Sequence, residues 1–117
     1  MSVTTGKLSG STDGKPIKIT STTSGAANTL HTGVAGTSSI DYVWLDVTNN
    51  SAAAVDLYIG WGGVTVDETL GPIEIAADAG PVRVAERTPI QNGQVVKAWA
   101  GSANTLLITG WSHRYSP

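Results

Sequence analysis

The sequence predicts an all-β fold, an antiparallel β-sandwich of jelly-roll type with about eight short strands and a flexible N-terminal arm. Two observations predict this class. Short runs rich in Val, Ile, Leu, Thr and Trp are cut every several residues by Gly, Asn, Asp or Pro, which suits strands joined by turns. No segment keeps a helical period for more than two turns. Short strands, loops of unequal length and prolines at strand starts favour a jelly roll, although other sandwiches and a small barrel fit the same pattern.

The N-terminal segment differs from the rest of the chain. Residues 1–14 hold only two aliphatic side chains, Val3 and Leu8, among Ser, Thr, Gly, Lys and Asp. A segment of this composition has little to bury. We therefore expect an arm that is disordered alone or ordered on a neighbouring molecule, followed by a single domain at residues 15–117.

Three strands are expected in the first half of the domain. The first alternates Ile17 and Ile19 with polar residues, and the second covers residues 29–34. The third, at residues 40–48, is the strongest. Its large side chains occupy both faces, which predicts a central strand: Val43, Leu45 and Val47 on one face, and Tyr42, Trp44 and Asp46 on the other.

The remaining runs predict hairpins, because each pair flanks a short turn. The turn Asn49-Asn50-Ser51 tolerates the positive φ angles that a tight hairpin needs. In the second hairpin, Glu74 and Arg83 would pair across the strands. The three predicted hairpins join residues 40–48 to 55–61, residues 71–77 to 81–87, and residues 94–102 to 103–116.

Composition excludes several classes of protein. The net charge of −2 and the scattered basic residues do not suit nucleic-acid binding. No apolar run is long enough for a membrane span, and the N-terminus lacks the pattern of a signal peptide, so we expect synthesis in the cytoplasm. The chain has no cysteine, so its stability must come from packing, strand pairing or association with other subunits.

No constellation for catalysis, metal binding or cofactor binding stands out. Asp41 and Asp46 lie on opposite faces of one predicted strand, so they cannot act as a carboxylate pair. His31 and His113 have no cysteine or carboxylate at metal-ligand spacing. The glycine-rich GWGG at residues 60–63 follows a strand without opening a helix, unlike a phosphate-binding loop. We expect a protein that is not an enzyme and that holds no cofactor or metal.

The aromatic residues are unusual, with four Trp, three Tyr and no Phe. Each indole N–H needs a partner, so partial burial or an interface suits these side chains better than a dry core. Exposed Trp and Tyr anchor protein interfaces and also form platforms on which sugars stack. Core packing remains the expectation for at least two of the four Trp.

The order of strands and turn residues along the chain resembles that of a family of small structural proteins from the head genes of tailed bacteriophages. The shared features are a Trp-bearing strand before an Asn-Asn turn, Trp-Gly-Gly after the next strand, Asp-Ala-Gly before a Val-rich strand, an Asn-Gly-Gln-Val-Val strand and a final hairpin starting at Ala-Asn. They span about residues 15–114 of this sequence.

This resemblance implies a capsid decoration or cement protein on the virion surface. Its partner would be the major capsid protein, and it would act as a homo-oligomer, with a trimer favoured. A tail, fibre-base or head-spike protein, or a carbohydrate-binding sandwich, remains an alternative. The arm and the exposed aromatics are the candidate interface: Val3, Lys7, Leu8, Trp44, Tyr58, Trp99 and Trp111.

Overall fold

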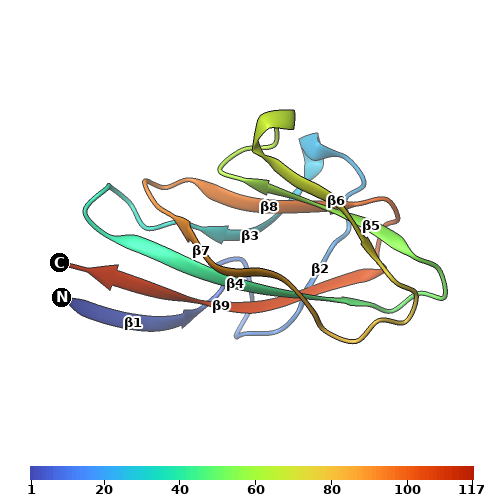
Figure 1. The fold of residues 1–117 in the computed structure, drawn as a ribbon, viewed down its shortest axis with the longest axis horizontal. Coiled ribbons are helices and arrows are strands. Elements are labelled where there is room, and N and C mark those ends of the chain that lie inside the picture. Colours follow the sequence, from blue (N-terminus) through green and yellow to red (C-terminus); the bar gives the residue numbers. More distant parts are fainter.

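The computed structural model describes residues 1–117 as an elongated sandwich of two sheets, 46 × 27 × 21 Å (Figure 1). Sheet A has the strand order β1-β9-β4-β7, with β2 also paired to β9, and sheet B has the order β3-β8-β5-β6. Two short 3-10 helices, η1 (Ser24–Ala26) and η2 (Val66–Glu68), lie in loops. The strands are β1 (Ser2–Lys7), β2 (Ile17–Lys18), β3 (Asn28–Thr32), β4 (Ile40–Asn49), β5 (Val55–Trp61), β6 (Thr69–Ile75), β7 (Val82–Ile90), β8 (Val95–Ala100) and β9 (Leu106–Ser116).

The strand pairing is nested, which is the topology of a jelly roll. The first strands, β1 and β2, pair with the last strand, β9, and β3 pairs with β8. Inside these pairs, β4 pairs with β7, and β5 pairs with β6. All these ladders are antiparallel, and they give two sheets with four main strand positions each. The predicted all-β sandwich of jelly-roll type is confirmed.

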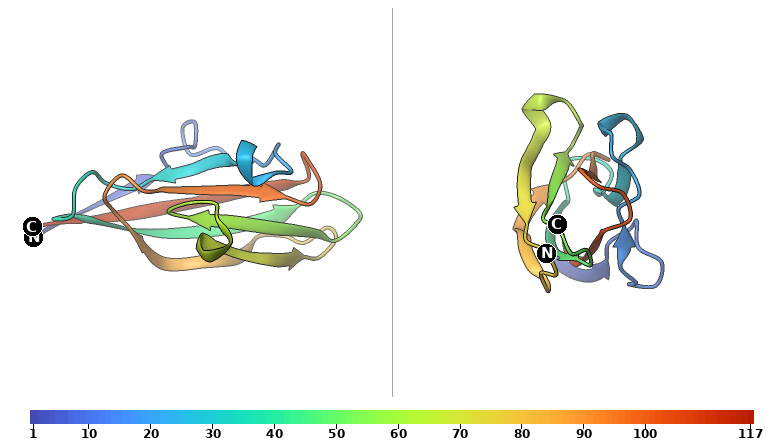
Figure 2. Two further views of the ribbon diagram at one scale, coloured as in Figure 1. Left: turned by 90° about the horizontal axis from the view of Figure 1, so that it is seen from above. Right: turned by 90° about the vertical axis from the view of Figure 1, so that its right-hand side faces the viewer.

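The core lies between the two sheets, which face each other in the end view of Figure 2. It follows from period-2 alternation, because every second side chain of a strand points inward. In β4, Val43, Leu45 and Val47 are fully buried, as the alternation predicts. They belong to one cluster with Leu57 and Ile59 of β5 on the opposite sheet. The outer faces keep the aromatic and polar side chains of the same strands.

The three predicted hairpins are wrong. In each case the two strands belong to different sheets: β4 and β5, β6 and β7, and β8 and β9. The physical reason is that both strands of each pair have an apolar face, and crossing to the other sheet buries both faces against each other. Only β5 and β6 are consecutive strands that pair with each other.

Asn49 shows how the β4–β5 connection crosses between the sheets. Its side chain is buried, and its Nδ2 donates hydrogen bonds to the carbonyl oxygens of Ala53 (2.9 Å), Ile75 (3.1 Å) and Ala76 (3.1 Å). Its Oδ1 accepts a hydrogen bond from the Ser51 amide at 2.9 Å. The predicted turn residue therefore fastens the crossing loop to the end of β6.

The N-terminal segment is part of the sandwich. Residues 2–7, expected to form a flexible arm, instead form the edge strand β1, paired along its length with β9. Leu8, expected at an interface, is a core residue with 1% of its surface exposed. The Gly10 amide then donates to the Leu30 carbonyl at 3.0 Å. The burial of Leu8 and the pairing of β1 with β9 therefore order a segment that its composition alone predicts to be flexible.

Candidate functional site

The structure divides the candidate interface residues among three places. Leu8 lies in the core. Tyr58 and Trp99 lie opposite each other on β5 and β8 of sheet B. The other four, Val3, Lys7, Trp44 and Trp111, lie on the outer face of sheet A, because the register pairs Val3 with Tyr115, and Lys7 and Trp44 with Trp111.

The outer face of sheet A carries a continuous group of aromatic rings, which we call the aromatic face: Tyr42, Trp44, Trp111, His113 and Tyr115. The Trp44 and Trp111 rings are stacked, with centroids 5.3 Å apart and planes at 8°. His113 lies 4.7 Å from Trp44, and Tyr42 meets Tyr115 edge-on at 5.2 Å. None of the five is buried, so flat apolar surface faces outward across β4 and β9.

Arg83 closes one end of the aromatic face. Its Nε donates to Asp46 at 2.6 Å, its Nη1 donates to Glu86 at 3.3 Å, and its guanidinium lies 5.3 Å from the Trp111 ring centre. The hydrogen bond to Asp46, with the charges of both carboxylates, raises the pKa of Arg83. The predicted pair of Glu74 and Arg83 is wrong, because β6 and β7 lie in different sheets.

Arg87 lies toward the other end of the face, at a β-bulge of β7. The β4–β7 register shifts between Val43 and Leu45, so Glu86 and Arg87 together oppose Trp44. Arg87 has a φ of 49°, a left-handed conformation that costs about 1–3 kcal/mol for a non-glycine residue. Its guanidinium lies 4.4 Å from the Tyr42 ring centre and 5.9 Å from that of Tyr115. The bulge thus places the Arg87 guanidinium beside the rings of Tyr42 and Tyr115.

The aromatic pair of sheet B is a separate feature. Tyr58 and Trp99 stack with centroids 5.4 Å apart and planes at 4°. They line a hollow of about 330 Å³ beside the loop that holds η2, with no Lys, Arg, Asp or Glu in its lining. Tyr58 is half-buried, whereas Trp99 is buried. Because the two sheets face outward in opposite directions, this pair cannot join the aromatic face in one contact.

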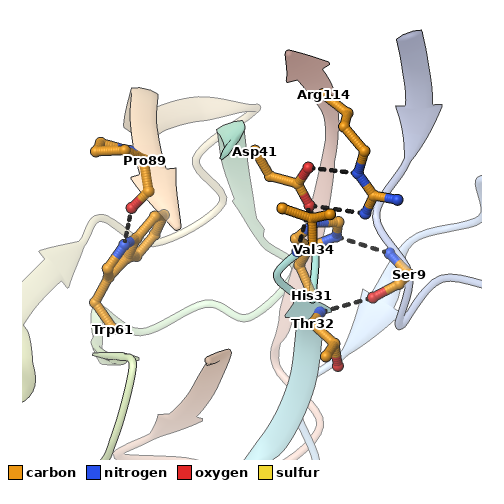
Figure 3. Close-up of polar contacts among 8 residues, drawn as sticks. All are labelled: Ser9, His31, Thr32, Val34, Asp41, Trp61, Pro89 and Arg114. Atoms are coloured by element: carbon orange, nitrogen blue, oxygen red, sulfur yellow. Dashed lines mark hydrogen bonds and ion pairs between the residues drawn. The ribbon is translucent and has the colours of Figure 1, made fainter. Parts of the chain in front are cut away.

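A buried polar cluster links the two sheets near the chain termini (Figure 3). Asp41 is fully buried and accepts hydrogen bonds from Arg114 Nε at 2.7 Å and Nη2 at 3.0 Å, and from the Val34 amide at 3.1 Å. His31 Nε2 lies 2.9 Å from Asp41 Oδ2. The Ser9 amide donates to His31 Nδ1 at 3.1 Å, so Nε2 carries the ring proton and donates to Asp41.

The environment of Asp41 favours its charged form. Burial alone would raise the pKa of this carboxyl, but hydrogen bonds from Arg114 and His31, with the charge of Arg114, outweigh burial and hold the pKa below its ordinary value. The same hydrogen bond raises the pKa of Arg114. Both ring nitrogens of His31 are engaged, so the imidazole has no free lone pair with which to act as a general base. We assign this cluster a structural role: it ties Ser9 and the β1 segment to the sandwich.

Sequence reasoning considered Asp41 and His31 separately and missed their contact. One signal was present: Asp41 has the same parity as Val43 and Leu45, which places it on the inner face of β4. A carboxylate on an inner face requires a cationic or hydrogen-bonding partner. The partners, ten and 73 residues away in sequence, become visible only with the strand pairing.

The fold and the site together define a jelly-roll domain whose exposed groups suit binding. No group of three or more His, Cys, Asp or Glu side chains is placed to hold a metal ion. No helix here has the length and apolar character that crossing a membrane requires. Comparisons with family models, curated proteins and solved structures return no match for this chain.

Proposed function

We propose that the protein is a non-enzymatic structural protein of a tailed-phage particle, a decoration or cement protein that binds the major capsid protein on the head surface. The aromatic face is the observation that carries this proposal. Stacked Trp44 and Trp111 offer a broad, rigid apolar surface flanked by Arg83, and Trp, Tyr and Arg are the residues that most often anchor protein interfaces. The resemblance of the sequence to phage head proteins supplies the partner.

The edge strand β1 extends this contact surface. Of the four sheet edges, β7 contains Pro89 and a bulge, β6 contains Pro72 and a bulge, and β3 contains a bulge, all devices that discourage pairing with another chain. By contrast, β1 pairs residue by residue with β9, has no proline and no bulge, and all six of its residues are exposed. Its free backbone groups can therefore pair with an extended segment of a partner.

In this proposal the protein catalyses no reaction. Identical copies, as a homo-oligomer in which a trimer is favoured, bind equivalent positions of a symmetric lattice, and many modest contacts add up through avidity. The protein is made in the host cytoplasm and is then held on the virion surface. The low share of charged residues, 14% of the sequence, fits this role, because it leaves docking mainly to shape and apolar contact.

The contact is tested with a truncation that spares the core. Deleting residues 2–7 removes only exposed side chains and keeps Leu8, whereas deleting residues 1–14 would also remove a core residue. We expect the truncated protein and Trp111→Ala each to bind purified heads at least about tenfold more weakly, with circular dichroism still showing a folded sandwich. The matched control is Tyr58→Ala, which removes an aromatic ring from the outer face of sheet B. Unchanged head binding by both sheet A variants would contradict the proposal.

The location of the protein in purified particles distinguishes the head from other sites. Many copies spread over the head support a decoration protein. A small ring of copies at the neck or tail would instead support the alternative, a tail, fibre-base or head-spike component. Quantitative mass spectrometry with immunogold labelling gives both the number and the position.

The second candidate function is a carbohydrate-binding module. The observation that favours it is the uncharged hollow on sheet B, where the stacked Tyr58 and Trp99 would face a neutral sugar ring. A glycan array with intrinsic Trp fluorescence tests it. Saturable binding of a neutral glycan that Tyr58→Ala abolishes would favour this function over head decoration.

A further inference from the structure

Both chain termini lie at one end of the sandwich (Figure 2). A second hollow lies there, with Met1 and Pro117 in its lining. Its volume is about 450 Å³, within the range of about 300–1,000 Å³ typical of small-molecule sites. It forms at the Arg87 end of the aromatic face, next to the loop before β4. The lining residues that matter here are Ser38, Ile40, Tyr42, Arg87, Tyr115 and Ser116.

Arg87 differs from the other arginines of the protein. Arg83 is paired with Asp46, and Arg114 is paired with Asp41, but the guanidinium of Arg87 has no carboxylate and no hydrogen-bond acceptor. The contact of the guanidinium with the Tyr42 ring involves no hydrogen-bond acceptor, so the N–H groups of Arg87 remain free to donate. A planar fork of free donors matches the two oxygens of a carboxylate.

The backbone conformation that gives Arg87 this orientation is energetically unfavourable. Five non-glycine residues have positive φ, and four of them are Asp or Asn in turns. Arg87 is the fifth and lies inside a strand. Backbone strain of this kind is enriched at active sites and ligand-binding sites.

The remaining lining supplies hydroxyl groups and aromatic surface. Ser38 and Ser116 line the hollow, and Ser39 donates to Ser116 Oγ at 3.3 Å, which leaves the Ser116 proton free to donate outward. Tyr42 and Tyr115 add two ring surfaces set at 88°. Hydroxyl donors, ring surface and a carboxylate-binding fork together match a sugar ring that carries an acid group. We propose that this pocket binds a sugar acid, with the carboxylate on Arg87 and the ring hydroxyls toward the serines.

This inference does not depend on the proposed function, because it concerns a small ligand and needs no phage particle. The test is an NMR titration of the untagged protein, since Met1 and Pro117 also line the pocket. The probe is glucuronate, with glucose and acetate as its neutral and acyclic controls. We expect saturable shifts of the Arg87 side chain and of the Ile40 and Ser116 amides with glucuronate, none with glucose, and binding by acetate at least about tenfold weaker.

Two variants distinguish binding at this pocket from nonspecific binding of the ligand. Arg87→Gly keeps the fold, because glycine adopts a positive φ without strain, and it should abolish the glucuronate shifts. Arg83→Gln removes a neighbouring arginine of the same strand and should leave them unchanged. Equal shifts in Arg87→Gly, or equal binding of glucuronate and glucose, would overturn the site. Equal binding of glucuronate and acetate would overturn its assignment to a sugar acid.

Discussion

Replacing Asp41 with alanine tests the buried cluster most directly. The carboxylate accepts four hydrogen bonds, two from Arg114, one from His31 and one from the Val34 amide, at 2.7–3.1 Å. Removing the carboxylate leaves the buried His31 Nε2–H and the part-buried Val34 amide without their acceptor, at about 1–3 kcal/mol for each unsatisfied buried group, whereas the Arg114 side chain is 44% exposed and regains water. A domain of this size has about 5–15 kcal/mol of total stability, so Asp41→Ala should lose a large part of it. Urea denaturation followed by Trp fluorescence measures the change.

The pH dependence of stability gives a second measurement on a folded variant. Because the pKa of Asp41 lies below its ordinary value of 3.8 in the folded protein, the folded state holds this proton less tightly than the unfolded chain. The stabilisation is therefore complete above the unfolded pKa and is lost as the pH falls through the lower folded value. Asp41→Asn carries no titrating group there, so the wild-type protein should lose more stability than this variant from about pH 5 downward.

The matched control is Asp46→Asn, an aspartate of the same strand that pairs with Arg83 at the surface. Solvent screens this exposed pair, so its loss should cost far less than the loss of the Asp41 carboxylate. If Asp41→Ala and Asp46→Asn lose similar stability, or if wild type and Asp41→Asn show parallel pH profiles, the buried cluster does not stabilise the sandwich as argued.

Three further changes test the packing. Leu8→Ala should cost about 2–5 kcal/mol in urea denaturation, as for a core leucine; a loss under about 0.5 kcal/mol would mean that residues 1–14 are an arm after all. Asn49→Ala should cost about 1–3 kcal/mol in the same assay, because it removes the donor to the buried Ile75 carbonyl at the end of β6 and to the Ala53 carbonyl of the crossing loop, and Asn49→Ser should recover only part of that loss. Gly110→Ala should lower the melting temperature strongly, because its Cβ would clash with the Trp44 carbonyl oxygen, while Gly101→Ala, with 3.9 Å to its nearest neighbour, should not.

Apart from β1, the strands of this protein were predictable, but their partners were not. Alternation in residues 40–49 gives both faces of β4, since side-chain direction is a local property. A turn such as Asn49-Asn50-Ser51 has the same residues whether the chain returns within one sheet or crosses to the other. Nested pairing decides between these outcomes, and it depends on contacts across the whole chain.

In the candidate site, too, the local side-chain directions were predictable and the strand partners were not. Alternation places Trp44 on an outer face, but only the β4–β9 register sets it beside Trp111. Val3 and Lys7 join that face because β1 pairs with a strand more than a hundred residues away. The bulge at Arg87 could not be predicted from the sequence, because an arginine stands at a position whose positive φ favours Asn or Gly.

The central place of β9 in sheet A has a consequence for synthesis. β9 pairs with β1, β2 and β4, yet it is the last of the nine strands to leave the ribosome. Before then, sheet A can form only its β4–β7 ladder, and Leu8 has no complete core to enter. Sheet A is therefore expected to form only once β9 has emerged, slowly for its length, as contacts between distant segments require. A nascent chain stalled before residue 106 would present unpaired strands and apolar side chains to chaperones.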